Sequence, residues 1–389
     1  MSRTDAQPTS VALADRSAVK ERTFAWNGET LDDHMRWFVD GLRRAMVAEG
    51  YEEMPAPGPE VQVVLHHLDP EDARPYRRKS APTFVVALAA MPTVPDDVLR
   101  AGYPLLVRGL ANLCVMVSER AGGGATAHFV TLEQGTYAVE HDGSDDRFFA
   151  GVFERIEPLA SSRLVIANEF RTDLPDELWS GDEQTRQVRR AGERLDALDL
   201  LPAAFPIEEI LSDRDLRHVR LLYGIGGLSY GNVSARRQPP TTSHYGPEFW
   251  MSASGVDKGA LHEMGKHILL VRGYDADRDC MILSVPPDVK PNRVSVDAIE
   301  HWMIYREHPD VGAILHVHAW MEGISSTEIN YPCGTVELAG AVADLVRRAP
   351  DPSRAVVGQR NHGLTITGLS LDEIFGRIDG KIVRNVPMD

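Results

Sequence analysis

The sequence is poor in cysteine, in basic relative to acidic residues, and in long hydrophobic runs. Its three cysteines, Cys114, Cys280 and Cys333, have no C-x-x-C spacing, which argues against a disulfide framework or a thiolate cluster. Lysine and arginine number 41 against 57 aspartates and glutamates, a net charge of −16. That balance argues against general nucleic-acid binding, because such binding usually needs a basic face. No apolar run is long enough to span a bilayer, so we expect no membrane anchoring.

Residues 1–24 lack the apolar segment of a secretory signal and are predicted to be a disordered leader. A cytoplasmic location is therefore the expectation. The 389 residues, with 43% hydrophobic and 25% charged residues, are typical of a globular protein of two or three domains.

Three further regions follow the leader. Residues 25–175 combine a helical pattern at 30–51 with several strand-like segments, which indicates an α+β domain of unknown role. Among these strand-like segments, residues 103–124 fit a helix better than a strand pair. Residues 176–204 are highly charged and predict a linker with a helix, and residues 205–389 alternate helix and strand signals.

The stretch DVGAILHVHAW, residues 310–320, carries His316 and His318 at alternate positions at the end of an apolar run. On a β-strand, residues i and i+2 point to the same face, so both rings can converge on one point. A solvated strand end is the plainer interpretation of this pair taken alone.

A third imidazole comes from the segment AVVGQRNHGLTITG, which reads as two strands joined by a tight turn at Asn361-His362-Gly363. A histidine in such a turn is well placed to project into a cleft. Three histidines with an open position are typical of catalytic zinc, although Fe(II) accepts the same ligands. Such a metal acts as a Lewis acid and stabilises an enolate oxygen.

Three other segments are weaker signals by themselves. The glycine-rich YGIGGLSYGNVSARR, residues 223–237, and the small residues Ser254 and Gly255 suit close backbone approach to an anion, but each is also an ordinary turn. Asp297 begins a short helix, where a helix cap is the alternative to a catalytic role. For His301 we favour a packed helix residue.

Taken together and in order, these segments resemble the class II aldolase/adducin family over about residues 205–380. The matching motifs are GNVSAR, SASG, SVDAIEH, HPDVGAILHVH and NHGLTITGLSLDEIF. The resemblance implies an α/β fold, with a C-terminal domain of α/β/α layers around a mainly antiparallel sheet. It does not reach the preceding α+β domain.

Carried over position by position, the resemblance implies a divalent metal, zinc foremost, with Fe(II) or Mn as alternatives. The implied ligands are His316, His318 and His362. Substrate-binding positions, which hold phosphate in sugar-phosphate members of the family, are Asn232, Ser254, Gly255 and Ser295. Asp297 stands where the family has a glutamate that ligates the metal or transfers a proton.

The sequence also departs from the family pattern. The second phosphate serine is Val296, Asp297 is one methylene shorter than glutamate, and the segment after His318 is some twenty residues shorter. That segment carries a catalytic tyrosine in the aldolases, for which Tyr331 is the candidate here. These departures point away from an ordinary phosphorylated ketose.

The expected function is a metal-dependent carbon–carbon lyase of class II aldolase type, acting on a small hydroxy-carbonyl substrate through a metal-stabilised enolate. A metal-dependent oxygenase, epimerase or dehydratase on the same scaffold is one alternative. A non-catalytic adducin-like binding or assembly module is another, although retention of three histidines argues against it. The resemblance also implies a homo-oligomer, a dimer or tetramer.

Overall fold

The computed structural model of the chain describes residues 20–28, 32–119, 124–203, 205–223 and 229–388. Residues 1–19 of the expected leader and 224–228 of the glycine-rich turn lie outside the described residues. The expected disorder is wrong for residues 20–24, which belong to the strand Lys20–Asn27. The chain divides into two units. Unit 1 contains Met1–Asp96, Arg108–Phe129 and Val139–Phe153, and unit 2 contains Asp97–Val107, Val130–Ala138 and Glu154–Asp389.

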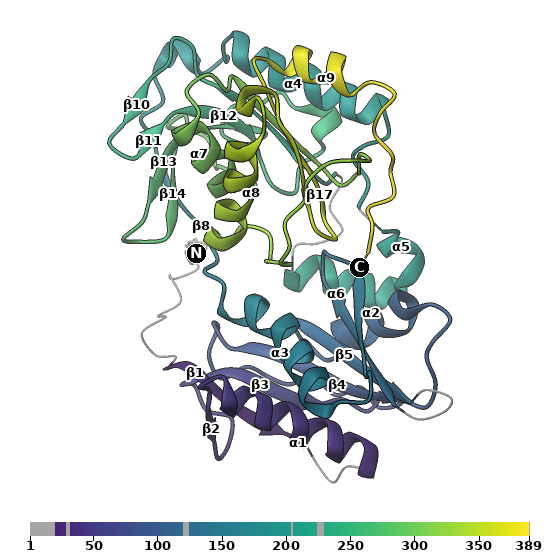
Figure 1. Ribbon diagram of the computed structural model, residues 1–389. Coiled ribbons are helices and arrows are strands. Elements are labelled where there is room, and N and C mark those ends of the chain that lie inside the picture. The colour runs from purple at the N-terminus through teal and green to yellow at the C-terminus, as the bar shows by residue number, and fades with distance from the viewer. Residues whose placement is uncertain (1–19, 29–31, 120–123, 204, 224–228, 389) are drawn as a thin grey trace, which may run out of the picture. The chain divides into compact units, whose positions relative to one another are not determined.

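A seven-stranded sheet of order β2-β1-β3-β4-β5-β6-β7 is the framework of the N-terminal part (Figure 1). Its strands are β1 Lys20–Asn27, β2 Glu52–Met54, β3 Val61–His67, β4 Phe84–Met91, β5 Leu113–Glu119, β6 Ala125–Thr131 and β7 Thr136–Glu140. The pairs β1–β3, β3–β4 and β4–β5 are parallel. Parallel strands are covered on both faces, which explains their nearly continuous apolar runs.

The strands of this part are accompanied by α1 Asp33–Ala48, α2 Val98–Arg108 and α3 Asp145–Ser161. The segment 103–124, expected as a helix, is instead divided between α2 and β5. The helix prediction is wrong for β5 because its residues Leu113–Ser118 pair with β4, a long-range contact that local periodicity does not reveal.

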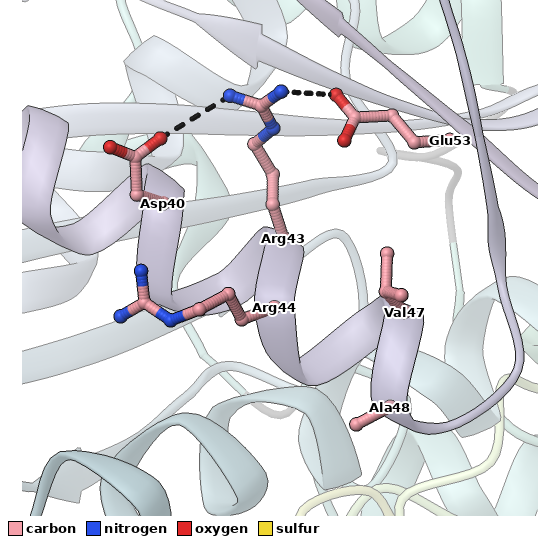
Figure 2. Close-up of a pocket in the computed structure, with 6 residues that line it drawn as sticks. All are labelled: Asp40, Arg43, Arg44, Val47, Ala48 and Glu53. Atoms are coloured by element: carbon pink, nitrogen blue, oxygen red, sulfur yellow. Dashed lines mark hydrogen bonds and ion pairs between the residues drawn. The ribbon is translucent and has the colours of Figure 1, made fainter.

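Helix α1 illustrates how local sequence specifies an element. Asp32 accepts a hydrogen bond from the Met35 backbone N–H and so caps the helix. On the solvent side, Arg43 forms ion pairs with Asp40 and Glu53, at 3.2 and 2.5 Å (Figure 2). The second pair ties the helix to β2.

Unit 2 is built on an eight-stranded sheet of order β16-β17-β15-β9-β12-β13-β14-β8. The strands are β8 Ala167–Arg171, β9 Asn232–Arg236, β12 Phe249–Ser252, β13 Ile268–Asp275, β14 Cys280–Ser284, β15 Ala313–Val317, β16 Val356–Gln359 and β17 Gly363–Gly368. Every neighbouring pair is antiparallel except β14–β8. The mainly antiparallel sheet expected for the C-terminal part is therefore confirmed, within a mixed α/β protein. A separate two-stranded ribbon pairs β10 Thr242–Ser243 with β11 Gly246–Pro247.

Two pairs of helices pack against this sheet (Figure 1). One pair is α4 Glu183–Ala197 with α9 Leu371–Ile378, and the other is α7 Ala298–Glu307 with α8 Val336–Arg348. The remaining helices are α5 Ile207–Ile210 and α6 Asp213–Tyr223, with short 3₁₀ turns η2 Asp176–Leu178, η3 Lys258–Ala260 and η4 Pro352–Arg354. No helix in the described part of the chain is both long and apolar enough to cross a bilayer.

The segment expected as a linker with a helix, 176–204, contributes that helix to the core of unit 2. Helix α4 starts at a capping box, in which Asp182 and Thr185 satisfy each other's backbone N–H groups. Val188 and Leu195 on its buried face belong to the core cluster of unit 2. Burial of such residues, worth about 1.5–3 kcal/mol for each side chain, fixes the helix on the sheet.

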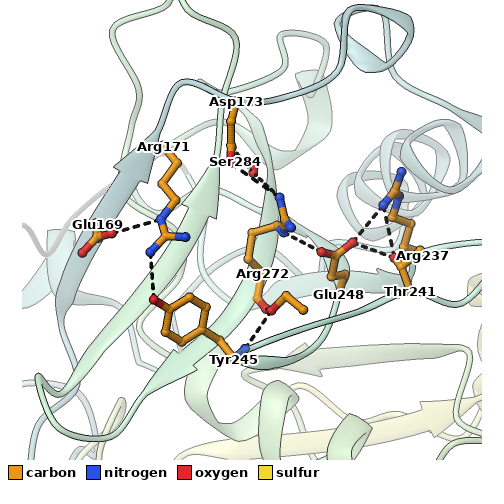
Figure 3. Close-up of polar contacts among 10 residues, drawn as sticks. Glu169, Arg171, Asp173, Arg237, Thr241, Tyr245, Glu248, Arg272 and Ser284 are labelled. Carbon is orange, nitrogen blue, oxygen red and sulfur yellow. Dashed lines mark hydrogen bonds and ion pairs between the residues drawn. The ribbon is translucent and has the colours of Figure 1, made fainter.

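A charged network lies where β8, β13 and β14 run side by side (Figure 3). The buried carboxylate of Glu248 pairs with Arg237 at 2.8 Å and with Arg272 at 2.5 Å. Arg171 of β8 donates to the Tyr245 hydroxyl at 2.9 Å. These bonds join the edge strand β8 to segments far away in the sequence.

Candidate functional site

Strand β15 sets the position of the first two histidines. It lies between β9 and β17, and in this register His316 is opposite Asn232 on one side and Thr365 on the other. Because these positions are opposite one another, their side chains share one face of the sheet. Thr365 donates to the Glu300 carboxylate of α7 at 2.5 Å, so this face is the one that α7 covers.

The third histidine lies in the turn between β16 and β17. Asn361 adopts a left-handed conformation with φ of +58°, which asparagine tolerates better than most residues. The missing side chain of Gly363 lets this turn approach β15, since a Cβ there would lie 2.2 Å from the Val317 carbonyl oxygen. The turn thus holds His362 against the strand that carries His316.

The three imidazoles converge. One ligand nitrogen from each of His316, His318 and His362 lies within 4.8 Å of the others. The Nε2 atoms of His316 and His362 are 3.2 Å apart. Two nitrogens bound tetrahedrally to one zinc at about 2.0–2.1 Å would be separated by about 3.3 Å. The donor set and its spacing therefore fit a divalent metal.

Hydrogen bonding and burial both favour the ligand form of these rings. Nδ1 of His316 bonds to the Leu364 carbonyl oxygen at 3.0 Å, which makes Nδ1 the protonated nitrogen and leaves Nε2 free. Burial lowers the pKa of His316 to about 4, and burial together with His316 lowers the pKa of His362 to about 3. Burial also holds the pKa of His318 well below its usual value, helped by the other two rings. Neutral imidazoles are the form that binds metal.

Asp297 lies beside this cluster and is not used as a helix cap. Although it is the N-cap residue of α7, its side chain makes no capping bond within the described residues. Its Oδ2 instead accepts a hydrogen bond from Asn232 Nδ2 at 2.7 Å, and Oδ1 has no partner among the described residues. Burial raises the pKa of Asp297, an effect that His362 and Asn232 partly offset. An oriented, half-satisfied carboxyl group can accept or donate a proton.

The structure brings together only part of the expected substrate-binding set. Ser295 is buried and accepts from Asn232 Nδ2 at 3.1 Å, so these two residues adjoin Asp297. Ser254 and Gly255 lie in an exposed turn, where Gly255 has a φ of +70°. Both remain predictions.

Tyr331 is half-buried. The charged groups that affect its pKa are Glu157 and Glu337, which add to burial in raising it. Its backbone carbonyl accepts a hydrogen bond from Gln134 Nε2 at 2.6 Å. The role of this tyrosine as a catalytic acid stays a prediction. His301, expected as a packed residue, is buried, with Nδ1 2.8 Å from the Ser234 hydroxyl.

Several residues at the cluster were not anticipated. The Sγ of Cys333 lies 3.3 Å from His362 Nε2, and Glu133 is hydrogen-bonded to Cys333. Glu133 also lines a small cavity together with His318 and Tyr230. No spacing rule connects residues 133, 333 and 362, so the sequence carried no signal for this contact.

Two more buried charges lie deeper in unit 2. Glu300 accepts hydrogen bonds from Gln359 and Thr365, and burial and Asp297 raise its pKa well above the usual range. Lys258 donates from Nζ to the Ser229 carbonyl at 2.9 Å, and burial lowers its pKa to about 8. The sequence could have indicated Glu300, because it is three residues after Asp297 and residues at this spacing are neighbours on a helix.

Residues 217–328 match the family model described as the class II aldolase and adducin N-terminal domain, which includes His316 and His318 but not His362. No protein of curated function matches the chain. Among solved structures, 31 chains match.

Three of these structures have the following similarities. YgbL from Klebsiella pneumoniae, a candidate aldolase/epimerase/decarboxylase, has 16% identity and a TM-score of 0.33, covering 51% of this chain and 84% of its own. An L-fuculose 1-phosphate aldolase has 17% identity and a TM-score of 0.34, covering 52% and 82%. An aldolase II superfamily protein from Pseudomonas syringae has 17% identity and a TM-score of 0.33, covering 53% and 73%. On the evidence of the family model, the chain carries a class II aldolase/adducin domain at residues 217–328.

Proposed function

We propose that the protein is a metal-dependent carbon–carbon lyase of class II aldolase type, which cleaves or decarboxylates a small hydroxy-carbonyl substrate. The observation that carries this proposal is the convergence of three ligand nitrogens within 4.8 Å, beside a buried carboxyl group. A purely structural domain has no need of three neutral imidazoles facing one point. The family match at residues 217–328 supports the same chemistry.

Each residue has a distinct task in this proposal. His316, His318 and His362 hold the metal, which we propose is zinc. When bound, the metal supplies Lewis-acid stabilisation of negative charge on the substrate oxygen. Asp297, oriented by Asn232 across 2.7 Å, takes the proton from the substrate hydroxyl group through its unpaired Oδ1.

The substrate that we propose is not a typical sugar phosphate. Val296 removes a hydroxyl donor that a phosphate would use, and Ser254 lies in an exposed turn. Two buried donors remain near Asp297. They are Asn232 and Ser295, and they suit a small polar group. We also propose that the protein assembles as a homo-oligomer, and this part of the proposal rests on the family resemblance alone.

Metal content of the purified full chain tests this function. We expect about one zinc for each chain and its loss in His316→Ala, His318→Ala and His362→Ala, while His262→Ala, an exposed histidine, serves as the matched control. Wild-type protein is then screened against hydroxy-keto acids with and without phosphate. A full metal complement in the triple histidine variant would refute the site. Oxygen consumption during turnover would instead identify an oxygenase.

A further inference from the structure

The turn between β6 and β7 belongs to unit 2 and contacts the segment that precedes α8. The turn is tightly specified: Thr131 N–H donates to the Gly135 carbonyl at 3.0 Å, and Gln134 N–H donates to the Thr131 hydroxyl at 2.9 Å. Gln134 then reaches the Tyr331 carbonyl at 2.6 Å. The position of residue 133 is therefore fixed on both sides.

The carboxyl group of Glu133 bonds to a residue that contacts the histidine cluster. It is hydrogen-bonded to Cys333, whose Sγ lies 3.3 and 3.4 Å from the two ring nitrogens of His362. It also lines the cavity that includes His318. Glu133 is thus connected to His362 through Cys333 and lines one cavity with His318, while Asp297 reaches the cluster from α7.

We propose that Glu133 is a second catalytic carboxyl group, which protonates the carbon left by bond cleavage. This inference rests on the proposed lyase function. Asp297 accepts the hydroxyl proton as the carbon–carbon bond breaks, and that bond's electron pair passes into the enolate. The Glu133 O–H bond then breaks, a C–H bond forms with the enolate electron pair, and the O–H pair stays on the carboxylate. No oxidant or reductant is needed.

The surroundings of the two carboxyl groups suit this division of tasks. Asp297 is held by Asn232, whereas Glu133 is bonded to a thiol and borders the cavity. Burial and the charges of Glu157 and Glu337 raise the pKa of Tyr331, the alternative proton donor. The cavity that Glu133 and His318 line has room for about one water molecule.

Binding of acetohydroxamate, a small two-oxygen chelator, to the zinc-loaded full chain tests this role by calorimetry. Glu133→Gln keeps the shape of the side chain but replaces the carboxyl O–H donor with a weaker amide N–H donor, so we expect up to about tenfold weaker binding with unchanged zinc content. Glu133→Asp should lose less. Glu322→Gln, an exposed glutamate on the segment after His318, is the control and should bind as the wild type does.

Three results would overturn the proposal. Equal affinity in Glu133→Gln would place the carboxyl group outside the ligand site. Failure of the zinc-loaded wild type to bind acetohydroxamate would also overturn the proposal, because the metal would then have no open position for a substrate. An equal loss in Cys333→Ala would make Glu133 a positioning residue for the thiol. If the substrate screen yields turnover, Glu133→Gln should lower kcat at least 100-fold with little change in KM. A wrong assignment of the metal site would be recognised by a different result, namely that the histidine variants retain zinc.

Discussion

Asn232 donates a hydrogen bond from Nδ2 to Oδ2 of Asp297 across 2.7 Å, although 65 residues separate them. The bond joins β9 to the start of α7, and both of its residues are buried. Because it holds the carboxyl group beside the histidines, it connects the stability of the sheet with the chemistry of the site.

Asn232→Ala should therefore destabilise the protein. The substitution leaves Asp297 buried with one hydrogen-bond donor fewer, a loss of about 1–3 kcal/mol in free energy of unfolding. Urea denaturation of the metal-free protein measures it. Asn292→Ala removes a comparable bond from an exposed asparagine and should cost little. Equal costs in the two variants would contradict the prediction.

Zinc should stabilise the folded protein through the three histidines. A ligand at 100 times its Kd that binds only the folded state raises the free energy of unfolding by about 2.7 kcal/mol. His318→Ala should abolish the corresponding rise in Tm, and His262→Ala should retain it. Identical zinc-induced shifts in both variants would show that the ion binds elsewhere.

Lys258 should make stability depend on pH. Its pKa is lowered to about 8 by burial, against an ordinary value of 10.5, so between these values the unfolded chain binds more protons than the folded one. The wild type should then gain stability as pH rises from 8 to 10.5. Relative to Lys258→Met, that gain should total roughly 3 kcal/mol, from 1.36 kcal/mol for each pKa unit.

Chemical denaturation of both metal-free proteins at several pH values gives this difference directly. Groups common to both proteins cancel in the comparison. A difference that stays constant from pH 7.5 to 10.5 would mean that Lys258 has an ordinary pKa in the folded state.

Glu248→Gln should break the network of Figure 3. Its carboxylate is buried between Arg237 and Arg272, and loss of one partner from a buried ion pair costs about 3–5 kcal/mol. Glu263→Gln interrupts an exposed pair with Lys266 and should change stability by less than about 1 kcal/mol. Thermal unfolding of the two variants in parallel makes the comparison, and similar Tm values would refute it.

Two helical glycines provide a matched test of packing. A Cβ on Gly192 of α4 would lie 1.9 Å from the Lys258 carbonyl oxygen of η3, so Gly192→Ala should force α4 and η3 apart and lower Tm. A Cβ on Gly340 of α8 meets nothing within 4 Å among the described residues. Gly340→Ala should therefore raise stability by about 0.4–1 kcal/mol, and a loss at Gly340 would contradict this.

Local patterns were enough to predict some elements. The apolar spacing of Met35, Phe38 and Leu42 predicted a helix at 30–51, and the structure has α1 at Asp33–Ala48. Alternation indicated a strand that carries His316 and His318, and β15 contains His316 and ends one residue before His318. A glycine after His362 indicated the turn. In each case the residues that determine the element lie within a few positions of it in the sequence.

Other features depend on contacts between distant segments. The parallel pairing of β8 with β14 and the approach of Glu133 to Cys333 join residues more than a hundred positions apart. No periodicity or propensity records such a pairing, because the partner lies outside any local window. The same reason explains why the sequence indicated a helix within the charged linker but not the place of that helix in the core of unit 2.

The strand β8 has a consequence for how this protein can be divided. It covers one side of β14 through five paired residues, Ala167 to Arg171. A fragment starting after residue 175 would leave the N–H and C=O groups of β14 on that side open to other chains, a recognised route to aggregation. The boundary of a workable fragment therefore lies upstream of Ala167, well before the residues that match the family.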